Sequence, residues 1–410
     1  MATTTVPVTS QEPLFVAGPR PAAPDVAYEA YEPFVAVGLF AGIGGIELGL
    51  RRAGHSTTLL SEIEPGARAV LTARFPDVPV HGDVRELDSL PKGVDLLAGG
   101  FPCQDLSQAG ATAGIKGSNS GLVAEAFRLL RTHDVPWLLL ENVPFMLRLN
   151  GGEALEHVVG ELERLGYRWA YRVVDSRAFG VPQRRERVYL LASRTGDPRD
   201  VLLVDDEGPP TLPKPEDWRD AACGFYWTEG LRGLGWAHDA VPTLKGGSTI
   251  GIPSPPAIVM PSGEIVKPDI RDAERLQGFD VDWTQPAEDV QRPGHRWKLV
   301  GNAVTVCVAD WIGRRLREPG RYDPSCDGLL VRHRGWPRAA WGDGSGSRYQ
   351  VAVTTWPERR PAPRLDEFLQ FPLTPLSKRA IAGFYSRTRR AKLRFPPGFL
   401  DLVRANLGSD

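Results

Sequence analysis

Short apolar runs alternate with segments of helical period along the first half of the chain. Strands are expected at 35–40, 57–63, 78–84, 94–98, 137–142, 169–174 and 188–192, and helices at 46–53, 66–75, 122–132 and 153–165. Strands interleaved with helices of this length are typical of a parallel sheet that is covered on both faces. The sequence therefore predicts an α/β fold with a doubly wound, mostly parallel sheet.

The character of the sequence changes after this region. From 195 to 267 Pro, Gly and Trp are frequent and helical periodicity is weak, which predicts a smaller inserted domain. Helical patterns return at 271–277 and 303–317. We therefore expect a disordered tail at 1–32, a main domain at 33–194, an inserted domain at 195–267, a return to the main domain at 268–326 and an extension at 327–410.

Composition excludes several classes of protein. Hydrophobic and charged contents of 42% and 24% are ordinary globular values, and no apolar run approaches the roughly 20 residues of a membrane span. The four cysteines form no CxxC pair, which argues against a metal site or a disulfide framework and fits a reducing cytoplasm. The first 32 residues do not resemble a signal peptide.

Charge is unevenly distributed although the net charge is only −1. The extension at 327–410 has 15 Lys and Arg against 7 Asp and Glu. A basic segment can follow a phosphate backbone, and a solvated helix face is the alternative explanation. We expect a chain that ends near residue 327 to keep its activity, unless Phe384, Phe399 and neighbouring aromatic residues pack the extension onto the body.

A reactive cysteine is predicted where the strand at 94–98 ends. The strand leads into Gly99-Gly100-Phe101-Pro102-Cys103, and the next strand, at 137–142, ends in Glu141 and Asn142. Because ligands of open parallel sheets bind at the carboxyl ends of the strands, Cys103 and Glu141 are expected in one site. A buried core cysteine is the alternative, which the polar, glycine-rich flanks disfavour.

A glycine turn follows the first strand and predicts a cofactor site. In the segment from Phe40 to Gly45, glycines allow the backbone to approach a ligand at a helix N-terminus. Glu62 stands 20 residues after Gly42, close to the spacing at which an acid reaches ribose hydroxyls, and Asp83 ends the third strand. A nicotinamide dehydrogenase uses similar geometry, but its GxGxxG fingerprint is absent.

Two arginines alternate in the segment Gln183-Arg184-Arg185-Glu186-Arg187. In an extended segment Arg185 and Arg187 point to the same side, which suits a shared anion or carbonyl group. An exposed basic strand edge is the other interpretation.

In their order along the chain, these motifs resemble those of the cytosine-C5 DNA methyltransferase family of bacteria and phages. The resemblance spans about 35–317 and includes 271–279, with Asp272 where the family usually carries Glu, and 301–304. It implies transfer of a methyl group from S-adenosylmethionine to C5 of a flipped cytosine in duplex DNA, through a covalent bond between Cys103 and C6. It also implies that the inserted domain is a target-recognition domain.

The resemblance assigns three groups of residues. The catalytic group is Cys103, Glu141, Arg185 and Arg187. The cofactor group is Phe40, Gly42, Ile43, Gly45, Glu62, Ile63, Asp83, Val84, Gly100, Pro102, Leu122, Asn302, Ala303 and Val304. The substrate group is Gln104, Ser107, Asn142, Gln183, Thr243 and Leu244, with Thr243–Gly247 as a DNA contact loop and 104–120 as a lid.

Several expectations about partners remain open at this point. Duplex DNA is the expected substrate, a cognate restriction endonuclease is an optional partner, and a monomer in the cytoplasm of a bacterium or a phage host is expected. The alternatives are an enzyme that methylates cytosine in tRNA and a non-catalytic relative that binds DNA. Trp218, Trp227 and Trp236 are expected to form local core.

Overall fold

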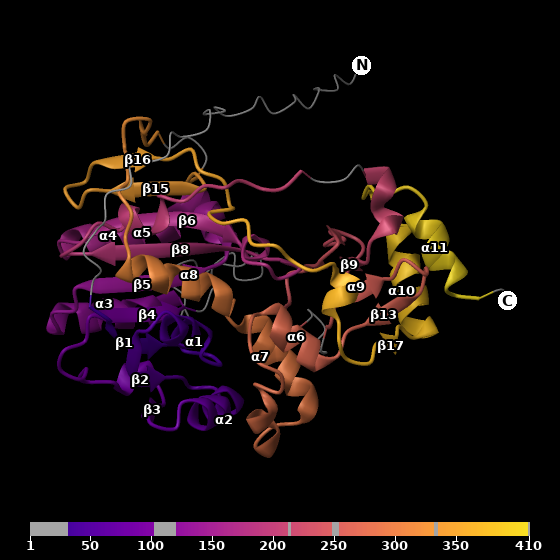
Figure 1. Cartoon of the computed structure of the whole chain (residues 1–410), viewed down its shortest axis with the longest axis horizontal. Coiled ribbons are helices and arrows are strands. Elements are labelled where there is room, and N and C mark those ends of the chain that lie inside the picture. The colour runs from indigo at the N-terminus through magenta and orange to yellow at the C-terminus, as the bar shows by residue number, and fades with distance from the viewer. Residues whose placement is uncertain (1–31, 102–119, 212–214, 248–253, 332–334, 409–410) are drawn as a thin grey trace, which may run out of the picture.

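The computed structural model describes residues 32–101, 120–211, 215–247, 254–331 and 335–408. Two lobes of unequal size lie along its longest axis (Figure 1). The larger lobe contains an extended sheet, and the smaller lobe contains short strands and the last helices of the chain. None of the helices in the described part of the chain combines the length and the apolarity needed to cross a membrane.

Ten strands of the described residues form the sheet of the large lobe, in the order β14-β16-β15-β6-β8-β5-β4-β1-β2-β3. Neighbours from β3 to β5 are parallel, whereas β8 is antiparallel to both β5 and β6. The bounds are β1 Val35–Leu39, β2 Ser56–Ser61, β3 Val80–His81, β4 Leu96–Gly100, β5 Trp137–Asn142, β6 Arg168–Asp175, β8 Glu186–Ser193, β14 Gly328–Leu329, β15 Ala339–Gly342 and β16 Arg348–Gln350.

Helices cover both faces of this sheet, so the predicted doubly wound α/β fold is confirmed. Apolar residues of α3 (Val123–Thr132) and α4 (Glu153–Arg164) join one core. Those of α1 (Gly45–Arg52), α5 (Arg199–Leu202) and α8 (Val306–Arg317) join the core on the other face. The spacing of the apolar residues in α4 explains its helix, because they recur along one face.

The strand β3 is shorter than expected. The prediction extended it over 78–84, but the chain turns after His81 into a 3₁₀ helix at Val84–Glu86. The carboxylate of Asp83 caps this turn by accepting the Arg85 N–H. Local capping therefore ends the strand early.

The small lobe is built from two separate parts of the sequence. Its sheet has the order β10-β9-β12-β13-β17, and a further pair joins β7 to β11. The bounds are β7 Gln183–Arg184, β9 Cys223–Phe225, β10 Ala237–His238, β11 Val241–Pro242, β12 Ala257–Val259, β13 Ile265–Lys267 and β17 Thr374–Pro375. The α-helices of the two lobes not yet named are α2 Pro65–Arg74, α6 Ile270–Leu276, α7 Arg296–Asn302, α9 Leu365–Phe368, α10 Lys378–Thr388 and α11 Phe399–Ala405.

Residues 327–410 differ from the appended extension that we expected. Strands β14 to β16 extend the large sheet through β15, which pairs with β6. Strand β17 and helices α10 and α11 complete the small lobe, where Phe384 and Phe399 are buried with Trp218. The alternative that we left open, packing of the aromatic residues, matches the structure.

The inserted domain also has other boundaries than 195–267. Residues Val201 to Leu203 belong to the core of the large sheet, so the small lobe begins after them. Within it Trp218 is buried, and Trp227 and Trp236 pack against the same cluster. The expectation that these tryptophans form local core is confirmed.

Candidate active site

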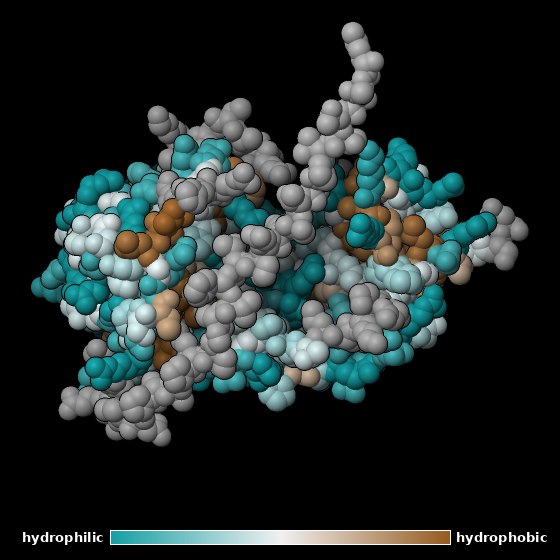
Figure 2. Space-filling view, turned by 90° about the horizontal axis from the view of Figure 1, so that it is seen from above, coloured by the Kyte–Doolittle hydropathy of each residue, from teal (hydrophilic) through white to brown (hydrophobic). Residues whose placement is uncertain are grey.

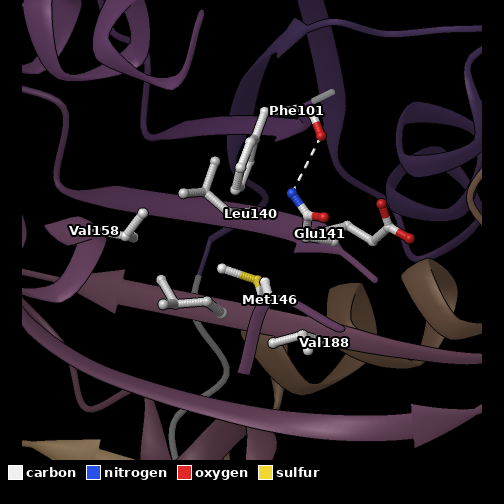
Figure 3. Close-up of a pocket in the computed structure, with 8 residues that line it drawn as sticks. Phe101, Leu140, Glu141, Met146, Val158 and Val188 are labelled. Atoms are coloured by element: carbon white, nitrogen blue, oxygen red, sulfur yellow. Dashed lines mark hydrogen bonds between the residues drawn. The ribbon is translucent and has the colours of Figure 1, made fainter. Parts of the chain in front are cut away.

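Strands β4 and β5 end side by side. They are parallel, and Gly100 is the register partner of Glu141. A Cβ atom on Gly100 would lie 3.0 Å from Oε2 of Glu141, so glycine leaves the carboxylate its space. The Asn142 amide donates a hydrogen bond of 3.2 Å to the carbonyl oxygen of Phe101 (Figure 3). The end of β5 therefore holds the chain that leads from β4 towards Cys103.

Four of the predicted site residues lie outside the described residues: Pro102, Cys103, Gln104 and Ser107. The expected lid at 104–120 falls almost wholly in the same undescribed segment. The last residue described before it, Phe101, is buried. What the structure fixes is thus the approach to Cys103 and its neighbour on β5.

Apolar side chains line a small cavity beside Glu141. Its lining includes Phe101, Leu140, Met146, Val158 and Val188. Figure 3 shows the Glu141 carboxylate turned away from these side chains. This surrounding keeps water from the base of the Glu141 side chain.

Burial raises the pKa of Glu141, and the cations of Arg187 and Arg185 oppose that rise. Nε of Arg187 lies 3.1 Å from Oε1 of Glu141, and both side chains are largely buried. A carboxyl whose pKa is raised retains a proton nearer to neutral pH, where it can act as an acid. Glu141 is thus suited to proton donation beside a fixed cation.

Arg185 is placed differently from Arg187. Its side chain is buried and donates to three backbone carbonyl groups: those of Leu244 at 3.0 Å, Gly301 at 3.3 Å and Ala303 at 2.6 Å. Burial lowers the pKa of this guanidinium to about 9. These carbonyl groups belong to the protein and not to a ligand, so this geometry supports a role of Arg185 in positioning the site.

Two residues expected to bind substrate are instead buried. The Gln183 side chain is fully enclosed, donates to the Leu276 carbonyl and accepts from the Leu244 N–H. Leu244 is 3% exposed. In this structure the two residues join β7 to the loop after β11, and their assignment to the substrate group stays a prediction.

Two other members of the substrate group also bond to the backbone. The Thr243 hydroxyl donates to the Arg184 carbonyl, and the amide of Asn142 is occupied by Phe101. Thr243 remains half-buried, so its surface can still meet a ligand.

The glycine turn after β1 and the end of β2 form a second group of predicted site residues. Phe40 and Gly42 have positive φ angles of 52° and 56°. Glu62 accepts hydrogen bonds of 2.8 Å from the Gly42 and Glu64 N–H groups. Burial raises the pKa of Glu62, although these N–H groups oppose the rise. Beside it, the apolar side chain of Ile63 is 62% exposed.

These features fit S-adenosylmethionine. A Cβ atom on Gly42 would meet nothing within 4 Å, so a ligand can approach the backbone of this turn. Glycine adopts the positive φ angle of this position easily. The Glu62 carboxylate suits ribose hydroxyls, and exposed Ile63 suits a flat adenine ring. The arrangement thus combines the polar and apolar surfaces that an adenosine needs.

The chain returns to this edge after α7. A Cβ atom on Gly45 would overlap the carbonyl oxygen of Val304, and one on Gly100 would lie 3.7 Å from the Val304 side chain. Asn302 is exposed beside Gly246. The motif at 301–304 thus joins the glycine turn to the end of β4, and buried Ala303 supports it.

Four predicted cofactor residues are placed less directly. Asp83 is engaged by the Arg85 guanidinium, which lowers the pKa of its carboxyl. Val84 and Ile43 are buried in core clusters, and Leu122 packs against one. A cofactor can meet their backbone or edges, but the side chains of Ile43 and Val84 serve packing.

Within the predicted contact loop Thr243–Gly247, the half-buried side chain of Lys245 has two partners that the sequence analysis did not anticipate. Lys245 forms an ion pair with Glu229 and lies over the Tyr226 ring, 3.7 Å from its centre. Tyr226 also donates a hydrogen bond to the Thr243 carbonyl. These contacts join residues that are far apart in the sequence, so no sequence motif predicts them.

Comparisons with known proteins agree with this geometry. Residues 34–222 match the family model described as C-5 cytosine-specific DNA methylase. The chain is 50% identical over 365 residues to the type II methyltransferase M2.BsuMI of Bacillus subtilis (strain 168), covering 86% of this chain and 93% of that protein. It is 28% identical to M.MspI of Moraxella sp, covering 69% and 70%.

Solved structures show the same fold at low sequence identity. The crystal structure of the S. pombe Dnmt2 methyltransferase is matched with a TM-score of 0.50 and 17% identity, covering 69% of this chain and 98% of that one. The Entamoeba histolytica methyltransferase EhMeth gives a TM-score of 0.50 and 15% identity, covering 70% and 98%. These likenesses support the methyltransferase fold.

The resemblance drawn from the motifs is thus confirmed by a relative matched over most of both chains. This chain belongs to the C-5 cytosine-specific DNA methylases, enzymes that transfer a methyl group from S-adenosylmethionine to C5 of cytosine in DNA.

Proposed function

We propose that Cys103, Glu141 and Arg187 carry out the methylation of cytosine, with Arg185 as a positioning residue. The observation that carries this proposal is the pair Glu141–Arg187, held at the end of β5 beside the strand that leads to Cys103. A raised pKa and a neighbouring cation give Glu141 the properties of an acid that protonates a ring nitrogen.

The proposed reaction begins with addition of the Cys103 thiolate to C6 of a flipped cytosine. Glu141 donates its proton to N3, which neutralises the charge that the addition creates, and the addition itself converts C5 into a nucleophilic enamine carbon. C5 then forms a bond to the methyl group, whose bond to the sulfonium sulfur would break at the same time. Loss of the C5 proton to water re-forms the C5–C6 double bond and expels Cys103 as thiolate, and N3 returns its proton to Glu141.

Arg187 holds the Glu141 carboxyl in place during these steps. A charge-assisted hydrogen bond contributes about 1.5–3 kcal/mol, which corresponds to roughly ten- to a hundredfold in rate if it forms only in the transition state. Arg185 acts through the backbone, because its guanidinium ties the Leu244 loop to residues 301–303.

S-adenosylmethionine supplies an electrophilic methyl group when it is bound. We propose that Glu62 binds its ribose, that Ile63 packs on its adenine, and that the backbone from Phe40 to Gly45 faces its methionine part. Asn302 and Val304 would close the same site from the returning chain.

The small lobe is proposed to read the DNA sequence. It comprises residues 218–267 together with 365–405, because the last helices complete its core. Viewed from above, the surface is hollowed between the two lobes, and hydrophilic residues are visible in the hollow (Figure 2). A duplex lying there would bring its bases to the Thr243 loop and its target cytosine to Glu141.

A methyl-transfer assay with two substrates tests this proposal. Wild-type protein, Cys103→Ala and Glu141→Gln are incubated with S-adenosylmethionine and either duplex DNA or tRNA, and the nucleosides are analysed. We expect 5-methylcytosine in DNA with wild type alone. Methylation of tRNA only, or activity of Cys103→Ala, would overturn the proposal.

We further propose that the enzyme works as a monomer in the bacterial cytoplasm and protects DNA from a cognate endonuclease. The type II names of its relatives support this setting. Resistance of methylated host DNA to restriction enzymes of known sequence preference would test it.

A further inference from the structure

A buried carboxyl group lies behind the cofactor site and has no part in the mechanism above. Glu47, in the first turn of α1, is 1% exposed. Neither of its carboxyl oxygens has a hydrogen-bond partner among the described residues. Buried acids without a partner are rare, because burial without compensation is unfavourable.

The fold makes room for this carboxyl group. A Cβ atom on Gly38 would overlap Oε1 of Glu47 and would lie 2.9 Å from Leu60. Gly38 and Leu60 are register partners on β1 and β2, one residue before those strands end. Glu47 therefore lies between α1 and the sheet, directly behind the strand ends that carry the Phe40 turn and Glu62.

Burial, opposed by the residue's own backbone N–H and aided by the charge of Glu62, raises the pKa of Glu47 to about 8. The elements packed against α1 offer no cation to offset this among the described residues. On α8, Arg314 pairs with Asp310 and Glu358, while Arg317 bonds to the Ala53 carbonyl at the far end of α1. Glu47 is therefore largely protonated at neutral pH in the free protein.

The expected ligand changes this balance. Bound at the proposed site, S-adenosylmethionine would bring the net positive charge of its sulfonium group close to the N-terminus of α1, whose helix dipole is itself positive. A nearby carboxylate would offset that repulsion, because opposite charges stabilise each other strongly where water is excluded. The demethylated product has lost the sulfonium charge and needs less compensation.

We propose that Glu47 is the counter-charge for the cationic cofactor: it is neutral in the free enzyme and transfers its proton to solvent when S-adenosylmethionine binds. Glu47 is buried, so it acts through its electric field and not by contact with the ligand. The inference rests on the cofactor site proposed above.

Calorimetry in buffers of different ionisation enthalpy tests the proposal, because it counts protons released on binding. At pH 7 wild type should release close to one proton with S-adenosylmethionine and a smaller fraction with S-adenosylhomocysteine. The variant Glu47→Gln should release no proton with either ligand, and it should no longer bind S-adenosylmethionine in preference to S-adenosylhomocysteine. The control Glu161→Gln, a buried glutamate paired with Arg131 and Arg164, should behave as wild type.

A second measurement needs no variant. The wild-type affinity for S-adenosylmethionine should rise from pH 6 to 8, by up to about tenfold per pH unit while the bound form is ionised and the free form is not. Binding without proton release or pH dependence would overturn the inference, as would equal release by a folded Glu47→Gln. Absence of any binding by wild type would instead refute the proposed cofactor site.

Discussion

Replacement of Phe399 by alanine should unfold the small lobe while the large lobe keeps its cofactor site. Phe399 is fully buried, and its ring centre lies between 5.2 and 6.2 Å from those of Phe225, Trp236, Trp218, Phe384 and Phe395. Removal of a buried phenylalanine costs about 3–5 kcal/mol. Domains are commonly stable by only about 5–15 kcal/mol, so the loss is a large part of the total.

The assay combines urea unfolding, followed by tryptophan fluorescence, with calorimetric binding of S-adenosylmethionine and with DNA binding. We expect an early unfolding transition, retained cofactor affinity and loss of specific DNA binding. The control is Phe371→Ala, because Phe371 is half-buried against Arg271 outside this cluster. An unchanged unfolding curve for Phe399→Ala would refute the assignment of the last helices to the core of the small lobe.

Three further predictions concern the active site. Arg185→Met should lower kcat and loosen the Leu244 loop, seen as faster amide hydrogen exchange there, whereas a purely catalytic arginine would leave exchange unchanged. Arg187→Met should lower the rate and raise the pKa of Glu141 further, because a lowering cation is removed; since the acid form is required, the alkaline limb of the pH–rate profile should move to higher pH, and an unmoved limb would contradict this. Gly100→Ala should reduce methyl transfer by displacing the Glu141 carboxyl; wild-type turnover would show that the 3.0 Å approach is unimportant.

The order of strands and helices in the large lobe could be predicted because it depends on local patterns. The run Trp137–Leu140 is buried on both sides, so it reads as a central strand, and α4 carries a clear apolar face. The direction of β8 could not be predicted in this way. This direction depends on the path of the chain between β6 and β8, and the spacing of hydrophobic residues does not predict that path.

The end of the chain was mispredicted because its contacts are distant in sequence. Strands β14 to β17 have only two to four residues each, and β15 and β17 pair with strands far away along the chain. Its basic residues also suggested phosphate contacts. Several are bound within the protein, since Arg348 pairs with Glu156 and Glu163, and Arg387 donates to the carbonyl groups of Trp227 and Glu229.

The candidate site was predictable where one residue type carries the chemistry, as at Glu62 and Glu141. The role of a site residue was not predictable where its side chain forms hydrogen bonds with backbone groups. The polar character of Gln183 and Arg185 suggested ligand contact, but their partners are carbonyl and amide groups brought together by folding. In the sequence, Glu47 is likewise only part of a helical pattern; that its carboxyl group lacks a partner among the described residues emerges from the fold.

Covalent trapping tests the central claim most directly. Wild-type protein is incubated with S-adenosylmethionine and a duplex whose target cytosines are replaced by 5-fluorocytosine, in which the final elimination is blocked. The account predicts a stable protein–DNA adduct that peptide mapping assigns to Cys103, and no adduct with Cys103→Ala. Absence of the adduct from an active wild-type enzyme, or its attachment to another residue, would contradict the proposed mechanism.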